Sequence, residues 1–360
     1  MKTVNDLIQD PIANYPEATV ACFDPTTGDL PRRQFDGERN VQFLEKLAAN
    51  RVRAVLIAST SGQGQSRTVP ELEQWFRSAA MARLGTTIKT ALLRPEDGVE
   101  VNTYLITLLK RLGYLVVFIR PGTNLSPDAS IEDVYENIHP IVEKAAMHGL
   151  AVGLYSISDV SGLPLLPETA AMLVAGSGGK QIVAVKVSEA NYETSTLLFL
   201  ESPALKHLKI LQGWDPHIVR ALQDGPKYDD DGRQRCGITS GPMSFAVYQY
   251  LHILQSAAQQ NWDETTEAMA ALISLFQSMQ GFLFRMQGDP NQSADLQRAK
   301  YIMGLGHPIT GTISIEQVNR FFAALEALPR IEDRIRLVLS LDIMGDGPCH
   351  QRLQDLLNSR

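Results

Sequence analysis

The chain has 360 residues, of which 44% are hydrophobic and 20% charged, and its formal net charge is −7. This is the composition of an ordinary globular protein, and the negative charge argues against nucleic acid or an anionic membrane as the main partner. No apolar run approaches the ~18 residues of a membrane span. The amino terminus carries no signal for secretion, and the widely spaced Cys22, Cys236 and Cys349 predict a reducing, cytoplasmic location and no metal site.

Apolar runs alternate with segments of helical spacing along most of the chain. After an irregular lead-in over residues 1–17, candidate strands begin near residues 18, 54, 87, 115, 151, 182, 209 and 235. Thr68 and Glu71 have the spacing of a capping box and mark the start of one intervening helix. Eight strands alternating with helices over about 240 residues predict an α/β fold with a (β/α)8 TIM barrel, here at residues 18–258.

Residues 259–360 are helical by pattern. They predict a C-terminal helical extension that packs on the barrel or on a neighbouring subunit. An open doubly wound sheet is the structural alternative, but no Gly-x-Gly-x-x-Gly lies between a strand and a helix. The segment 176–180 resembles a phosphate loop only superficially, because it precedes a strand, and we interpret it as the turn that ends a helix.

The strand Ile182–Val187 carries a lysine near its end. Its β-branched, apolar composition is typical of a strand buried on both faces in a parallel sheet. An ammonium group is costly to bury without a partner, and burial favours the neutral amine, which can attack a carbonyl carbon. We therefore expect Lys186 to form a Schiff base with a 2-oxo acid. The alternative is a structural lysine that reaches the rim of the barrel.

Further candidates lie where other strands end, because the active site of a TIM barrel lies at the carboxyl ends of its strands. These candidates are Ser59-Thr60-Ser61-Gly62, Tyr155 and Thr239-Ser240-Gly241. Small residues in such a loop let backbone N–H groups approach an anion closely. An ordinary turn and a packed barrel tyrosine are the alternatives for the first two.

Taken together, these blocks resemble the dihydrodipicolinate synthase/N-acetylneuraminate lyase superfamily of class I, Schiff-base aldolases, over residues 16–310. The loop Ser59-Thr60-Ser61-Gly62-Gln63 stands where the family has Gly-Thr/Ser-Thr-Gly-Glu. The other matching blocks are Leu154-Tyr155-Ser156 for its Tyr-Asn-x-Pro block, Val185-Lys186 for its lysine strand, and Gln212-Gly213 with Gly237-Ile238-Thr239-Ser240 for the ends of its last two strands.

The resemblance implies a role for each candidate. Lys186 would attack the keto carbon of pyruvate or a similar donor, and Tyr155 would shuttle protons. The implied substrate-binding residues are Thr60, Ser61 and Gly62, which would hold the donor carboxylate, and Gly237 and Thr239, which would line the other side. The resemblance also implies a homo-oligomer, a tetramer or a dimer.

The chain departs from the members of the family that make dihydrodipicolinate. The arginine that binds their second substrate is replaced by Val160, and Phe118-Ile119-Arg120 lacks their relay tyrosine. Gln63 replaces the glutamate of the loop. These departures predict a different reaction and a more apolar acceptor half-site.

Three cationic side chains lie near other strand ends: Lys89, Arg94 and Arg120. They are candidates for binding an anionic substrate, but we expect them to be solvated at the surface. The expected function is a cofactor-free lyase or aldolase that acts on a small 2-oxo acid, with an aldehyde acceptor such as that of a 4-hydroxy-2-oxoglutarate-like or deoxy-sugar-acid substrate. The alternatives are a Schiff-base dehydratase of a sugar acid and a catalytically impaired barrel that binds or scaffolds.

Overall fold

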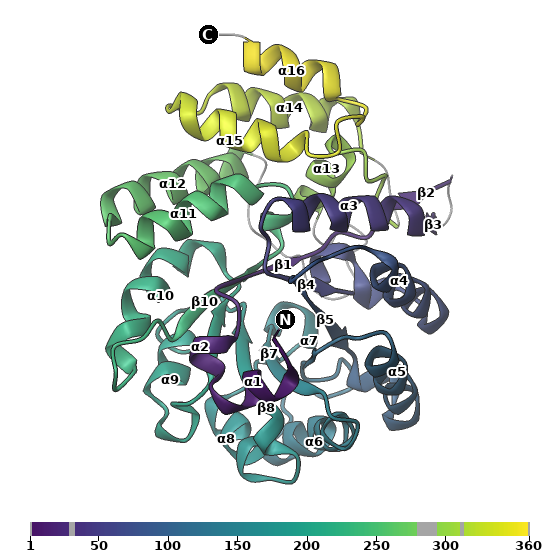
Figure 1. The fold of residues 1–360 in the computed structure, drawn as a ribbon, viewed down its shortest axis with the longest axis vertical. Helices are drawn as coiled ribbons and strands as arrows, with labels where there is room; N and C mark the ends of the chain where they lie inside the picture. The colour runs from purple at the N-terminus through teal and green to yellow at the C-terminus, as the bar shows by residue number, and fades with distance from the viewer. Residues whose placement is uncertain (1, 29–32, 279–293, 310–312, 359–360) are drawn as a thin grey trace. The chain divides into compact units, whose positions relative to one another are not determined.

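A computed structural model of the chain describes residues 2–28, 33–278, 294–309 and 313–358. The chain forms two compact units, and neither is one continuous stretch (Figure 1). Unit 1 comprises Met1–Val20, Arg53–Ala58 and Gly85–Ser240, and unit 2 comprises Ala21–Val52, Ser59–Leu84 and Gly241–Arg360. The division at residue 258 that the sequence suggests stays a prediction.

A closed barrel of parallel strands is the core around which unit 1 is built, in the order β1-β10-β9-β8-β7-β6-β5-β4. Its strands are β1 (Ala18–Ala21), β4 (Ala54–Ile57), β5 (Ile88–Leu93), β6 (Val116–Ile119), β7 (Ala151–Ser156), β8 (Ile182–Val187), β9 (Lys209–Gln212) and β10 (Cys236–Ser240). Every strand residue except Lys89 is buried, as expected of a parallel sheet covered on both faces. The predicted TIM barrel is confirmed.

Helices follow the strands within unit 1 and cover the barrel (Figure 1). They are α5 (Val99–Arg111), α6 (Ile131–Met147), α7 (Ser158–Ser161), α8 (Pro167–Ala175), α9 (Thr196–Glu201) and α10 (Ile218–Asp224). A capping box of Ser130 and Asp133 begins α6, so the first N–H groups of this helix have side-chain acceptors.

The expectation of an irregular lead-in is wrong, because the amino-terminal segment contains two short helices. They are α1 (Val4–Gln9) and α2 (Pro11–Asn14). Thr3 and Asp6 form a capping box at the start of α1, and Asp10 caps α2 by accepting from the N–H of Ala13. Helices this short complete too few turns to show a periodic apolar pattern in the sequence.

Unit 2 contains a two-stranded antiparallel hairpin, short 3-10 turns and helices. Its elements are β2 (Thr26–Thr27), β3 (Gln34–Phe35), α3 (Gly37–Ala49), the turns η1 (Thr60–Gly62) and η2 (Gly64–Ser66), α4 (Val69–Met81), α11 (Val247–Ala258), α12 (Trp262–Ser278), α13 (Ala294–Ile302), α14 (Ile315–Glu326), α15 (Ile331–Leu341) and α16 (His350–Asn358). The capping box of Thr68 and Glu71 at α4 is confirmed. Helices are present in the region 259–360 that was predicted to be helical, and residues 279–293, 310–312 and 359–360 of that region lie outside the described residues.

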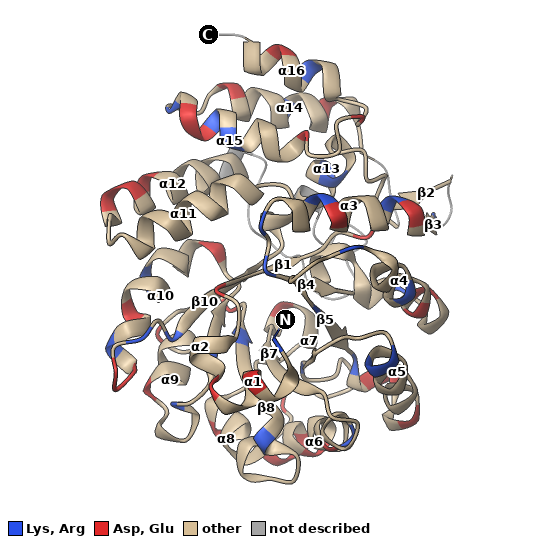
Figure 2. Ribbon diagram, viewed as in Figure 1, with Lys and Arg blue, Asp and Glu red and all other residues tan. Residues whose placement is uncertain are grey.

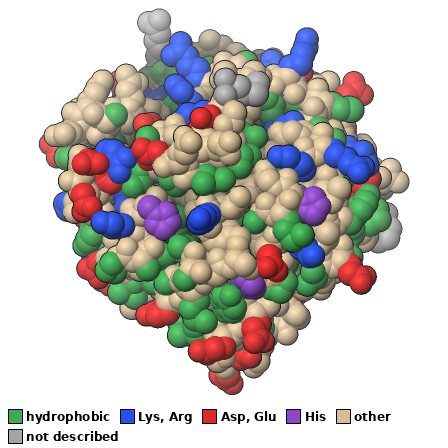
Figure 3. Space-filling view, turned by 60° about the horizontal axis from the view of Figure 1, so that its bottom comes forward, with side chains coloured by type: hydrophobic (Ala, Val, Ile, Leu, Met, Phe, Trp, Pro, Cys, Tyr) green, Lys and Arg blue, Asp and Glu red, His purple; other side chains and the backbone are tan. Residues whose placement is uncertain are grey.

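Charged side chains of both signs occur along the helices of each unit (Figure 2). On the face drawn in Figure 3, acidic side chains gather at the lower end, and basic side chains lie in the upper and middle part. Within the described ranges, no helix combines the length and the apolar character needed to cross a membrane.

Candidate active site

Lys186 and Tyr155 form a pair on neighbouring strands. They lie opposite each other in the register of β7 and β8, and Nζ of Lys186 is 4.0 Å from the centroid of the Tyr155 ring. The lysine is 4% exposed and the tyrosine 1%. An ammonium group at this distance is attracted by the face of the ring, and a phenol can pass protons to groups bound beside it. The pair brings an amine and a phenol together.

Two contacts place this pair on the inner face of the barrel. Alternate residues of a strand lie on the same face of the sheet, and so do residues in register on neighbouring parallel strands. By these two rules, Tyr155 and Lys186 lie on the same face as Phe118 of β6 and Lys209 of β9. Nζ of Lys209 donates to the carbonyl of Ile12 at 3.2 Å, and Tyr15 packs edge-on against Phe118. Because β6 and β9 are not neighbours, the segment 12–15 meets both strands at the barrel interior.

Ser188 and Gly213 complete the surroundings of the lysine, and sequence reasoning did not propose either as a site residue. The Tyr155 hydroxyl donates to Oγ of Ser188 at 3.4 Å. A Cβ added to Gly213 would lie 2.2 Å from Oγ of Ser188 and 2.9 Å from Cε of Lys186. Glycine at 213 therefore leaves room for the lysine side chain. Strand alternation, which puts residue 188 on the face of residue 186, was the signal that pointed to the serine.

Thr239 and Gly237 both lie on β10, but in different surroundings. The Thr239 carbonyl is 3.2 Å from the position of a Cβ on Gly213, and its buried Oγ1 has no hydrogen-bond partner among the described residues. A Cβ on Gly237 would instead meet the carbonyl of Glu17 at 2.8 Å and Leu211 at 3.1 Å. Thr239 thus keeps a polar atom for a ligand, whereas Gly237 permits close packing against the segment before β1.

Glu189, which sequence reasoning also missed, ties the end of β8 to the segment after β7. Its carboxylate accepts hydrogen bonds from Oγ of Ser156 at 2.6 Å, from N of Ser158 at 2.9 Å and from Oγ of Ser158 at 2.5 Å. Oγ of Ser156 in turn accepts from N of Leu165 at 3.1 Å. Burial raises the pKa of Glu189, although its hydrogen bonds oppose the shift. The carboxylate therefore fixes the chain that follows Tyr155.

The loop predicted to hold the donor carboxylate belongs to unit 2, where Thr60–Gly62 forms the turn η1. Oγ of Ser59 donates to the carbonyl of Cys22 at 2.9 Å. A Cβ on Gly62 would lie 2.5 Å from that same carbonyl, so glycine is required at this position. Oγ1 of Thr60 is buried and finds no partner within the described part of the chain.

Residues near the carboxyl end of the chain hold this loop. Nε2 of Gln297 donates to the carbonyl of Ser61 at 2.9 Å, and N of Ile309 donates to Oε1 of Gln63 at 2.9 Å. Gln63 has a left-handed backbone, with φ of 56°, which few non-glycine residues adopt. The conformation of the loop thus depends on α13 and on the segment after it.

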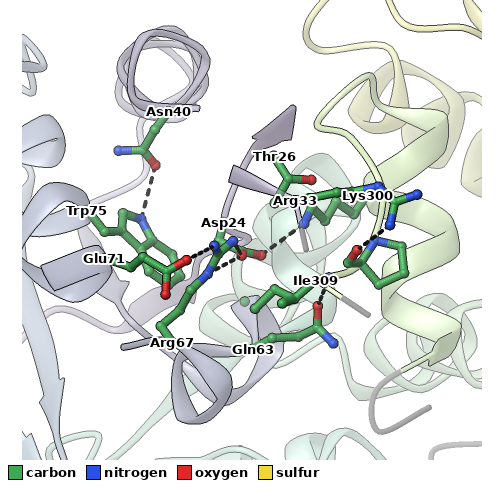
Figure 4. A network of polar contacts seen from close by, with 12 residues as sticks. Asp24, Thr26, Arg33, Asn40, Gln63, Arg67, Glu71, Trp75, Lys300 and Ile309 are labelled. Atoms are coloured by element: carbon green, nitrogen blue, oxygen red, sulfur yellow. Dashed lines mark hydrogen bonds and ion pairs between the residues drawn. The ribbon is translucent and has the colours of Figure 1, made fainter. Parts of the chain in front are cut away.

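A buried network of ions lies beside the loop (Figure 4). Asp24 accepts from Nε of Arg67 at 3.0 Å and from Nζ of Lys300 at 3.0 Å, and Arg67 also pairs with Glu71 at 3.2 Å. The side chains of Asp24 and Lys300 are 0% exposed. Burial lowers the pKa of Lys300 to about 8, although Asp24 opposes the shift. One carboxylate therefore joins η2 to α13.

The expectation that Arg94 and Arg120 are solvated at the surface is wrong, because both are buried. Nη1 of Arg120 is 3.1 Å from Oε2 of Glu96, and Nε of Arg94 donates to Oδ2 of Asp97 at 2.7 Å. Lys89 is partly buried rather than free in solvent. Buried guanidinium groups require acceptors, and the acidic residues after β5 supply them.

Within the described ranges, no group of three or more His, Cys, Asp or Glu residues is placed to hold a metal ion. The polar groups that these contacts place near Lys186 are the Tyr155 phenol, the Ser188 hydroxyl and the Thr239 carbonyl. An amine, a phenol and hydroxyls suffice for imine chemistry on a carbonyl compound.

No protein-family model matches the chain. It is 27% identical over 201 residues to 4-hydroxy-tetrahydrodipicolinate synthase of Xylella fastidiosa, a match that covers 53% of this chain and spans only 60% of the length of that curated relative.

Solved structures share the fold. Dihydrodipicolinate synthase from Aquifex aeolicus has a TM-score of 0.68 at 16% identity, over 88% of this chain and 99% of that chain. A prophage protein of the dihydrodipicolinic acid synthase family from E. coli K12, in complex with pyruvate, has a TM-score of 0.70 at 14% identity, over 88% and 99%. A variant of the 2-keto-3-deoxygluconate aldolase of Sulfolobus solfataricus has 0.68 at 16% identity, over 86% and 95%.

Proposed function

We propose that the chain is a Schiff-base lyase or aldolase of the dihydrodipicolinate synthase/N-acetylneuraminate lyase family, a proposal that its distant sequence similarity and its fold support. Its substrate is a 2-oxo acid of the pyruvate type, with an aldehyde as acceptor or product. The observation that carries the proposal is the buried contact of Lys186 with Tyr155, 4.0 Å from Nζ to the ring centroid, on the inner face of a TIM barrel.

The proposed reaction begins with attack by the Lys186 amine on the keto carbon of the donor. The carbinolamine loses water to give a protonated imine, and Tyr155 gives and takes the protons of these steps. The imine withdraws electrons, so C3 loses a proton to form an enamine, which attacks the aldehyde carbon to make the C3–C4 bond. Cleavage is the reverse, and water releases the lysine at the end in either direction.

Three further groups support this chemistry. Ser188 accepts a hydrogen bond from the Tyr155 hydroxyl at 3.4 Å and so orients it. The buried Oγ1 of Thr239, for which no described residue is a hydrogen-bond partner, is available to a bound oxygen atom. Glu189 keeps the chain after Tyr155 in place through Ser156. The carboxylate-binding role of Thr60, Ser61 and Gly62, and the role of Gly237 in substrate binding, stay predictions from the sequence.

We further infer that the reaction is not the synthesis of dihydrodipicolinate. Val160, which stands where those synthases carry an arginine, is buried in α7 and offers no donor. Phe118 and Ile119 end β6 without a tyrosine. An acceptor would therefore have to be held by other groups of this barrel.

Trapping of the imine tests the proposal. The protein is incubated with pyruvate and reduced with borohydride, and its intact mass is measured. We expect a gain equal to one reduced pyruvate, and we expect Lys186→Met to abolish it. Lys89→Met, which removes a partly buried lysine at the other end of a barrel strand, is the matched control and should keep the gain. Absence of the gain with pyruvate and with a panel of other 2-oxo acids would refute the proposal.

A further inference from the structure

Arg120 follows β6 directly and lies at the same level of the barrel as Tyr155. Ile119 is in register with Leu154, so the residues after them, Arg120 and Tyr155, occupy equivalent positions on adjacent strands. Phe118 is on the inner face, and alternation brings residue 120 to that face as well. The residue is 0% exposed. The register thus places Arg120 level with Tyr155 at the carboxyl end of the neighbouring strand.

The guanidinium of Arg120 is only partly satisfied. Its two Nη atoms bind the carboxylate of Glu96, and Nη1 also donates to the carbonyl of Pro121 at 2.8 Å. Nε is buried, and no described residue accepts a hydrogen bond from it. Arginine keeps its proton, so this N–H always needs an acceptor, and leaving it without one is costly. Glu96 fixes the group, and Nε remains for a ligand.

We propose that Arg120 binds a carboxylate on the aldehyde half of the substrate, an inference that rests on the proposed imine chemistry at Lys186. A carboxylate accepts a charge-assisted hydrogen bond from Nε, which is stronger than the bond that a hydroxyl would accept. The substrate class is then a 4-hydroxy-2-oxo dicarboxylic acid. This proposal differs from the sequence-based expectation of a more apolar acceptor half-site.

The cleavage step balances without a further reactant. The C4 hydroxyl loses its proton, its oxygen forms the aldehyde carbonyl, and the C3–C4 bond breaks. Its electron pair moves into the enamine on Lys186, which takes a proton at C3 and is hydrolysed to pyruvate. Arg120 keeps its proton throughout and only anchors the leaving aldehyde through the carboxylate.

Two substrates that differ only at this position test the inference: 4-hydroxy-2-oxoglutarate, with a carboxylate on C4, and 4-hydroxy-2-oxopentanoate, with a methyl group there. Both carry the 2-oxo group and can be trapped on Lys186 by borohydride whether or not they are cleaved. The measurement is the concentration that half-saturates trapping. We expect the dicarboxylate to need about tenfold to a hundredfold less than its methyl analogue, the worth of one charge-assisted hydrogen bond.

Arg120→Lys keeps a cation opposite Glu96 but has no Nε–H donor, so the preference for the dicarboxylate should vanish. Arg94→Lys is the matched control, because Nε of Arg94 already donates to Asp97 at 2.7 Å, and it should keep the preference. Equal half-saturation of the two compounds in the wild type, or an undiminished preference in Arg120→Lys, would overturn the inference. Failure of pyruvate to trap in the wild type would refute the proposed function instead.

Discussion

Asp24 is the anion that two buried cations share, so Asp24→Asn leaves both without their carboxylate. The side chains of Asp24 and Lys300 are 0% exposed and that of Arg67 is 1% exposed, which excludes compensation by water. Removing one partner of a buried ion pair costs about 3–5 kcal/mol. Asparagine keeps one acceptor oxygen and Arg67 keeps Glu71, so we expect a loss of ~3 kcal/mol. That is a large part of the ~5–15 kcal/mol by which a folded domain is stable.

Lys300→Met is the matched change on the cationic side. It leaves Asp24 paired with Arg67 and puts an apolar chain of similar length in a buried place. Burial lowers the pKa of Lys300 to about 8, from 10.5, so the desolvation of this ammonium outweighs the attraction of Asp24. We therefore expect Lys300→Met to cost less than ~1 kcal/mol.

The assay is urea unfolding, with the free energy of unfolding compared at equal slopes. The folded-state pKa of Lys300 lies below its ordinary value, so the folded protein loses this proton first as the pH rises. The wild type should therefore gain stability from pH 8 toward pH 10.5, and Lys300→Met should lack this gain. Equal destabilisation by Asp24→Asn and Lys300→Met would refute the reasoning, as would a change at Asp24 below ~1 kcal/mol.

Two further changes test the surroundings of the lysine. Gly213→Ala should slow trapping of pyruvate about 100-fold, because its Cβ would lie 2.9 Å from Cε of Lys186. Gly37→Ala, where the nearest atoms would be 3.6 Å away, is the control, and an unchanged rate in Gly213→Ala would contradict the steric argument. Glu189→Gln should flatten the pH dependence of the free energy of unfolding. Burial raises the folded-state pKa of Glu189 above 4.5, so the wild type loses stability as the pH rises from 4.5 to that folded-state pKa. Parallel pH profiles of the free energy of unfolding in the wild type and in Glu189→Gln would contradict this contribution of Glu189.

Local patterns were enough to predict the barrel and the strand that carries the lysine. The strand Ile182–Val187 has the bounds that its apolar pattern predicts, and the capping box of Thr68 and Glu71 marks the start of α4. These features depend on residues close in sequence, so the pattern contains the information. The helix α1 was not predicted, because it is too short to show the periodic spacing of apolar residues that is typical of a helix.

The site was predictable only in part, because its remaining contacts join distant segments. The sequence around Arg120 is compatible with a solvated arginine, and only the fold shows that Glu96 pairs with it. The role of Glu189 becomes visible only in the fold, where the hydroxyls of Ser156 and Ser158, at the end of β7, donate hydrogen bonds to its carboxylate. No local pattern relates Gln297 to the carbonyl of Ser61. Pairings of this kind arise from tertiary packing, which a single sequence does not display.

The measurement that tests the account most directly is the position of the reduced pyruvate on the chain. After borohydride trapping, the protein is digested and the modified peptide is sequenced by mass spectrometry. The account predicts one modified residue, Lys186, at a stoichiometry that approaches one per chain. Modification of another lysine, such as Lys300 or Lys209, or no modified peptide at all, would contradict it.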